Sequence, residues 1–170
     1  MRTDHQAPLR ILQVAALGFP SDQGSQVYVE GMCRALVRRG HHVSLACYGH
    51  GLLEWSGDFP LHRTPRVPGY ARLRAGPDLV KPWLDLCLAG VVAKQEADIL
   101  HAHNYEAPLS AVIGRRGRTI PLVYSAHTLM EQELPTYFVG ATSRRLAGWG
   151  GRVLDQSIPR LADHAIALSE

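Results

Sequence analysis

The hydrophobic pattern along the chain alternates between short apolar runs and segments with helical spacing. Apolar runs of this length, bounded by Gly, Pro or polar residues, are typical of buried β-strands. Six such runs occur, at 9–17, 42–47, 59–63, 98–103, 121–126 and 162–168. The run at 59–63 is the shortest of the six and gives the weakest strand signal.

Segments with helical spacing separate most of these strands. They cover 24–39, 79–96 and 107–116, and a further helix ends near Leu161. A long connection that contains Gly140 and the glycine-rich run 148–151 is expected to lead into that last helix. For the first helix, the pattern predicts an apolar face made of Val27, Met32, Ala35 and Leu36.

Strands that alternate with helices indicate βαβ units and a parallel sheet covered by helices on both faces. Because crossover connections are right-handed, the expected fold class is α/β, an open doubly wound parallel sheet of the Rossmann-like type. The 170 residues are expected to form one domain. In such a sheet ligands bind outside the carboxyl ends of the strands, so the residues just after each strand are the candidates for function.

Composition and charge narrow the class of protein further. The longest apolar stretch, 86–93, is far short of the roughly 18 residues that a membrane span needs. Three widely spaced cysteines do not suggest a disulfide framework, which favours a cytoplasmic location. The formal net charge is only +3, but the 18 basic residues comprise 16 Arg and 2 Lys, and arginine pairs well with phosphate and carboxylate oxygens.

The first strand leads into a loop that contains Gln23, Gly24 and Ser25. A glycine-containing loop that opens a helix exposes free N–H groups at the positive end of the helix dipole, which makes an anion site. The loop matches neither the dinucleotide fingerprint nor the P-loop, and a plain strand-to-helix turn is the alternative.

Histidines gather at the ends of the fourth and fifth strands. His101 and His103 alternate with Ala102 and therefore lie on the same face of the fourth strand, and His127 ends the fifth. Three imidazoles could bind a metal ion. Polar residues at this edge of a parallel sheet are equally well explained by hydrogen bonds to a sugar or phosphate.

A basic stretch follows the third strand. Between Asp58 and Asp78 lie Arg63, Arg66, Arg72 and Arg74, without any acidic residue. This composition suits an anionic substrate or a membrane surface, with a solvated loop as the alternative. No nucleic-acid-binding motif accompanies it, so we expect no nucleic-acid partner.

Several segments together resemble a known family. In order along the chain, the sequences RILQVA, QGS, ALVRRGHHV, DILHAHN, PLVYSAH and ADHAIALS resemble the N-terminal domain of the family 4 (group 1) glycosyltransferases of the GT-B fold. The resemblance implies two Rossmann-like domains that face a cleft, with the N-terminal one mainly holding the acceptor. It also implies sugar transfer of the hexosyltransferase type from a nucleotide-sugar donor, with retention of configuration and without a cofactor or bound metal.

The resemblance also implies roles for individual residues. The loop residues Gln23, Gly24 and Ser25 would approach the donor phosphates or the acceptor, although the family commonly has paired glycines where this chain has Gln23 before Gly24. His127 would face the transferred sugar and stabilise the transition state. The acceptor side would be lined by His103, Asn104, Tyr105 and Glu131. The basic stretch would meet an anionic or lipid-linked acceptor, which implies peripheral contact with the cytoplasmic membrane face.

Residues 1–170 are therefore expected to be the acceptor-side domain, with the C-terminal donor-binding domain absent from this chain and the chain alone inactive. Two other functions stay open on the residues. One is a stand-alone carbohydrate- or nucleotide-binding module without catalysis. The other is a metal-dependent hydrolase that uses His101, His103 and His127.

Overall fold

One parallel sheet organises the protein. The computed structural model describes residues 7–51, 53–68, 70, 76 and 78–168. All six predicted strands form and pair in parallel, in the order β3-β2-β1-β4-β5-β6. Their bounds are β1 Arg10–Gly18, β2 His42–Tyr48, β3 Leu61–Arg63, β4 Ile99–His103, β5 Leu122–Ala126 and β6 His164–Ala167. The expected α/β, doubly wound fold class is confirmed. The strand order reverses between β1 and β4, where such sheets open a crevice.

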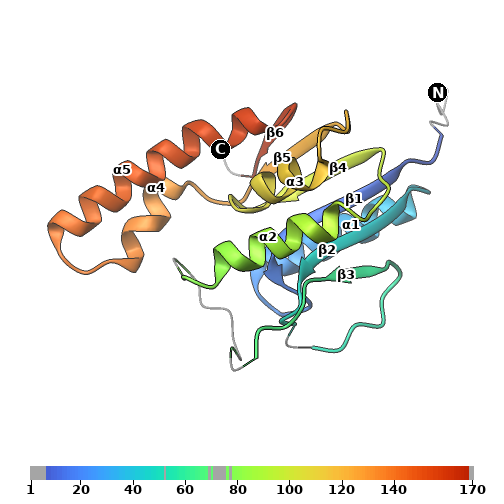
Figure 1. The fold of residues 1–170 in the computed structure, drawn as a ribbon, viewed down its shortest axis with the longest axis horizontal. Helices are drawn as coiled ribbons and strands as arrows, with labels where there is room; N and C mark the ends of the chain where they lie inside the picture. The colour runs from blue at the N-terminus through green and yellow to red at the C-terminus, as the bar shows by residue number, and fades with distance from the viewer. Residues whose placement is uncertain (1–6, 52, 69, 71–75, 77, 169–170) are drawn as a thin grey trace.

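Helices cover both faces of the sheet (Figure 1). Their bounds are α1 Gly24–Arg38, α2 Lys81–Val92, α3 Ala107–Arg115, α4 Met130–Glu133 and α5 Ala141–Ser157, with short 3-10 turns η1 Leu134–Tyr137 and η2 Ile158–Leu161. α2 and α3 pack against each other on one face, and α1 packs on the other against β1 and β2.

The side chains of β1 alternate between the two apolar layers. Leu12 and Val14 pack beneath α2 and α3, whereas Ala15 and Leu17 pack against α1. A strand buried on both faces explains why the sequence shows a continuous apolar run here rather than an alternating one. Gln13 is the exception within this run, and it is fully buried.

The buried face of α1 differs from the predicted one. Val27, expected in the core, is 58% exposed, while Gln26, Val29 and Cys33 are buried. The prediction was wrong for Val27 because it ranked positions by apolarity alone, whereas Leu36 packs against the core as expected. The helix instead turns the polar Gln26 inward, toward the end of β1.

The glycine-rich segment 148–151 is also helical, contrary to the expectation of an irregular connection. Its glycines allow α5 to lie closely against α4: a Cβ on Gly151 would stand 2.2 Å from the carbonyl oxygen of Met130. Asp155 of α5 completes the contact by accepting hydrogen bonds from the backbone N–H groups of Met130 and Glu131. Close packing therefore outweighs the low helix propensity of glycine. The α4–α5 pair extends beyond the sheet at the left of Figure 1.

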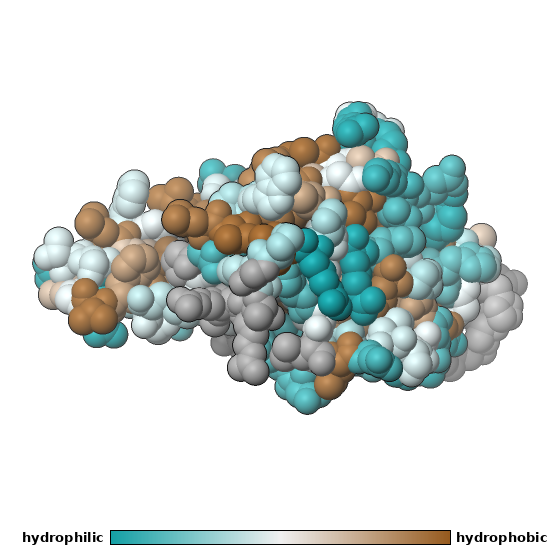
Figure 2. Space-filling view, turned by 60° about the horizontal axis from the view of Figure 1, so that its bottom comes forward, coloured by the Kyte–Doolittle hydropathy of each residue, from teal (hydrophilic) through white to brown (hydrophobic). Residues whose placement is uncertain are grey.

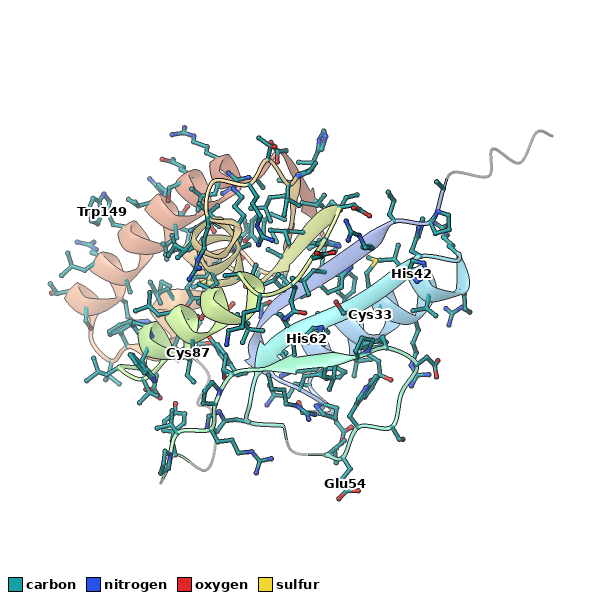
Figure 3. The ribbon with its side chains drawn as sticks, turned by 45° about the vertical axis from the view of Figure 1, so that its right-hand side comes forward. Cys33, His42, Glu54, His62, Cys87 and Trp149 are labelled. Atoms are coloured by element: carbon teal, nitrogen blue, oxygen red, sulfur yellow. The ribbon has the colours of Figure 1, made fainter. Side chains whose placement is uncertain are left out.

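Apolar side chains are exposed on the outer side of α5. Leu146, Trp149 and Val153 are 65%, 68% and 44% exposed. Figure 3 shows Trp149 pointing away from the body of the protein, and Figure 2 shows apolar patches over this end of the molecule. These side chains add nothing to the core of the sheet. Among the described residues, no helix is both long and apolar enough to cross a membrane.

The close approach of α5 to α4 can be tested at two neighbouring glycines. We expect Gly151→Ala to lower the free energy of unfolding by about 1–3 kcal/mol, because the new methyl group would overlap the backbone of Met130. Urea unfolding followed by circular dichroism would measure the change.

Gly150→Ala is the matched control in the same helix. A Cβ at Gly150 meets only the Leu134 side chain, at 4.0 Å, so alanine should leave stability unchanged or raise it by up to about 1 kcal/mol. Equal destabilisation by both substitutions would contradict the packing described for Gly151.

Candidate functional site

A cavity of about 690 Å³ lies at the carboxyl ends of the central strands. Five of the residues predicted from the sequence line it: Gln23, Ser25, Asn104, Tyr105 and His127. The cavity also has walls that the sequence did not indicate, formed by Tyr48, Lys81, Glu106, Glu133 and Tyr137 among others. The strand order therefore brings together polar residues from distant parts of the chain.

His103 lies beneath this cavity rather than on its wall. It is fully buried, and each of its ring nitrogens has a hydrogen-bond partner. Nδ1 lies 3.2 Å from Nε2 of His127, and Nε2 lies 2.6 Å from Oε1 of Gln13. His103 is therefore placed to support His127, whereas the sequence assigned it to the acceptor side.

His101 and His103 share one face of β4, as the alternation predicted. Their rings lie 4.4 Å apart, centroid to centroid, and Nε2 of His101 is 2.8 Å from Oγ of Ser125. Leu100 and Ala102 pack on the opposite face beneath α2 and α3. The histidines, like Gln13 on β1, thus belong to the α1 side of the sheet. This side carries a line of buried polar groups across three adjacent strands.

Burial keeps the three imidazoles neutral. Desolvation, with a smaller contribution from the charge of His127, lowers the pKa of His101 to about 4. Burial also lowers the pKa of His103 well below its ordinary value and lowers that of His127. At neutral pH each ring therefore carries a single proton, and its two nitrogens differ, one donating and the other accepting.

The first loop stands at the start of α1, beside the cavity. Gln23 precedes the helix, and no side chain caps the first N–H groups of α1. A Cβ on Gly24 would meet nothing within 4 Å, so Gly24 leaves open space at this helix end. Gln26 anchors the loop from below, since its Nε2 donates to the carbonyl of Gly18 at 3.4 Å. The arrangement can accept an anion at the helix N-terminus.

A cluster of polar residues forms another wall of the cavity. Lys81 forms an ion pair with Glu106, with 3.4 Å between Nζ and Oε1, and both side chains are largely buried. Tyr48 donates its hydroxyl to Asp85 behind this wall. Burial raises the pKa of Asp85 to about 6, against the opposing effect of the Tyr48 hydrogen bond. Burial likewise raises the pKa of Glu106, which Lys81 partly offsets.

The remaining predicted residues lie elsewhere. Glu131 is turned away from the cavity and pairs with Arg152 of α5. Its neighbour Glu133 lines the cavity instead, where Oε1 accepts from the Tyr137 hydroxyl at 2.6 Å. Because both residues lie in the helix α4, a spacing of two residues points their carboxylates in different directions. The sequence analysis did not predict this helix and therefore did not distinguish the two side chains.

Arg63 and Arg66 of the basic stretch are not among the described residues that line the main cavity. Arg63 donates to the carbonyl of Phe19, and Arg66 donates to that of Gly49. Both line a second hollow of about 310 Å³ together with Trp55. Arg72 and Arg74 lie outside the described residues.

Metal binding by the histidines would compete with the contacts already described. Both nitrogens of His103 and one of His101 have hydrogen-bond partners. Within the described ranges, no group of three or more His, Cys, Asp or Glu side chains is arranged to hold a metal ion.

Two residues central to the site were missed by sequence reasoning. Gln13 supports His103, and Tyr28 of α1 stands edge-on to His127 at 5.0 Å between ring centroids. A polar residue in the middle of an otherwise apolar strand was a usable signal for Gln13, because a buried amide needs a partner. Tyr28 gave no comparable signal.

Comparison with known proteins places this geometry in context. A family model described as Glycosyltransferase Family 4 matches residues 23–170. Among solved structures, sucrose-phosphate synthase from Thermosynechococcus elongatus is similar, with a TM-score of 0.58 and 14% sequence identity over 94% of this chain and 47% of that one. The chain thus spans about half the length of that structure, and the likeness concerns the fold. No curated protein matches the chain.

The neutral state of His101 predicts how stability changes with pH. The folded His101 has a pKa of about 4 against an ordinary value of 6.5, so between these values the unfolded chain binds more protons than the folded one. The free energy of unfolding should therefore fall as the pH is lowered from 6.5 to 4 through this group. His101→Gln, which keeps a polar group near Ser125, should reduce that slope in urea titrations at stepped pH.

Asp85→Asn should change the pH dependence of the free energy of unfolding in the opposite direction, over a similar pH range. Asp85 titrates near 6 in the folded protein against an ordinary value of 3.8, so the folded state holds the extra proton and gains stability on acidification. Removing it should make the loss of stability below pH 6 steeper. Unchanged slopes in both variants would contradict the protonation states given above.

Proposed function

The chain belongs to Glycosyltransferase Family 4, and on this premise we propose that it is the acceptor-side domain of a two-domain enzyme of the GT-B fold. The enzyme would transfer a sugar from a nucleotide-sugar donor, with retention of configuration, to a glycan, lipid-linked or small-molecule acceptor. The observation that carries the proposal is the cavity at the reversal of strand order, with His127 on its wall and free N–H groups of α1 at its side.

We assign to His127 the contact with the transferred sugar. It is half-buried, neutral and on the cavity wall, which suits a group that exchanges hydrogen bonds with sugar hydroxyls. As the glycosidic bond to the nucleotide breaks, positive charge develops on the sugar ring. A neutral imidazole avoids the repulsion that an imidazolium would add there.

The first loop would hold the negative charge of the donor. The uncapped N–H groups at the start of α1 and the open space at Gly24 allow a phosphate to approach the backbone. A leaving nucleotide diphosphate requires such preorganised donors. A second domain would supply the rest of them, together with the pocket for the nucleotide.

The acceptor would occupy the opposite wall, near Asn104 and Tyr105. The Lys81–Glu106 pair adds a donor and an acceptor suited to a hydroxyl-bearing molecule. We propose no protein-bound metal, since both nitrogens of His103 are already hydrogen-bonded. Arg63 and Arg66, exposed beside the second hollow, would contact an anionic acceptor or the cytoplasmic membrane face.

The need for a second domain gives the first test. We expect the 170-residue chain to release no nucleotide from nucleotide sugars, because half of the phosphate-stabilising groups would be missing. The same chain extended by whatever follows it in its reading frame should do so in the presence of an acceptor. Nucleotide release and the anomeric configuration of the product, read by NMR, would measure both expectations.

Sugar transfer by the 170-residue chain alone would contradict the proposed need for a second domain. Saturable sugar binding by the chain, with no transfer by any longer form, would instead favour the stand-alone binding module.

A second test addresses His127. In the longer protein His127→Ala should lower kcat on the order of 100-fold, because it removes a group that contacts the reacting sugar. His164→Ala is the matched control, since His164 lies exposed on the edge strand β6 and not among the cavity-lining residues. Equal rates for His127→Ala and the parent would overturn the assignment.

A further inference from the structure

A chain of three hydrogen-bonded side chains runs inward from the cavity. His127 follows β5, His103 ends β4, and Gln13 lies within β1. Nε2 of His127 is 3.2 Å from Nδ1 of His103, whose Nε2 is 2.6 Å from Oε1 of Gln13. The inner two members are fully buried, so solvent does not compete for their hydrogen bonds.

The hydrogen bond between His103 and Gln13 determines which ring nitrogens of His103 and His127 carry protons. An amide oxygen only accepts, so Nε2 of His103 must carry the proton of that ring. A neutral His103 then has a lone pair on Nδ1, and this atom accepts from His127. Nε2 of His127 therefore carries its proton, which leaves Nδ1 of His127 as the nitrogen with the free lone pair. Among the described residues, no hydrogen bond to Nδ1 of His127 occurs.

Rings on two sides restrain this arrangement. Tyr28 stands edge-on to both imidazoles, with centroid distances of 5.0 Å to His127 and 6.1 Å to His103. His101 packs against His103 from within β4, at 4.4 Å. The rings thus have little freedom to rotate into another hydrogen-bonding pattern.

We propose that Gln13 and His103 are positioning residues that fix His127 in the Nε2–H tautomer, so that its Nδ1 accepts a hydrogen bond from a hydroxyl of the sugar in the cavity. Only the last step, the contact with the sugar, rests on the proposed function. The low pKa values of His103 and His127 agree with the neutral rings that the arrangement requires.

The tautomer can be measured without any substrate. Two-bond ¹H–¹⁵N NMR spectra of the ¹⁵N-histidine-labelled chain distinguish a protonated from an unprotonated ring nitrogen, and His127→Gln assigns the signals of His127. We expect His127 to be protonated at Nε2 and His103 at Nε2 in the parent protein. Protonation of His127 at Nδ1 in the parent protein would overturn the proposal. This measurement needs no substitution of the buried residues Gln13 and His103.

Variants of Gln13 test whether the inner end of the chain sets the tautomer. Gln13→Leu removes the acceptor, and the spectra should then show His127 as a mixture of tautomers. Gln13→Glu restores an oxygen acceptor and should restore the Nε2–H form. His164→Gln is the matched control: it replaces an exposed histidine of the edge strand β6 that takes no part in these hydrogen bonds, and it should leave the tautomer of His127 unchanged.

Gln13→Leu that retains a pure Nε2–H form of His127 would overturn the positioning role. In the longer protein, Gln13→Leu should lower kcat roughly 10-fold with little change in KM, and Gln13→Glu should recover it. The tautomer measurement separates the two proposals. An Nε2–H form with no effect of His127→Ala on transfer would refute the proposed function and leave the positioning of His127 intact.

Discussion

Parallel strands cannot be joined by tight turns, and this constraint governs how the protein is built. Each strand must return through a crossover, so that all carboxyl ends meet at one edge of the sheet. The reversal of strand order between β1 and β4 then separates the first crossover helix from the later ones. This topology brings together the start of α1 and the ends of β4 and β5, and the cavity lies between them.

The two faces of the sheet carry different kinds of buried side chains. Beneath α2 and α3, β1 and β4 present only apolar side chains, namely Leu12, Val14, Leu100 and Ala102. Toward α1 the same strands present Gln13, His101 and His103, whose burial is costly unless each polar atom is paired. The pairing of these side chains with one another and with Ser125 offsets part of that cost, although Nε2 of Gln13 has no hydrogen-bond partner among the described residues. The α1 side thus carries the buried polar side chains of β1 and β4, and the other side supplies most of the apolar packing.

The sequence predicted what depends on periodicity. The six strands follow from short apolar runs, the parallel sheet from the succession of strands and helices, and the shared face of His101 and His103 from alternation within one strand, and each of these signals is local. It did not predict what depends on contacts between distant segments. The burial of Gln26 rather than Val27, the helical glycines of α5 and the outward turn of Glu131 are all set by packing partners elsewhere in the chain.

The same distinction explains why His103 was given the wrong position within the site. Its place at a strand end put it near the cavity. Whether a residue there faces the ligand or supports its neighbour depends on how far along the strand it lies from the cavity. The register places His103 opposite Ala15 of β1 and Ser125 of β5, one step before β5 ends and the chain reaches His127. Two residues along the strand direction therefore separate a side chain that meets the cavity from one that holds another in place.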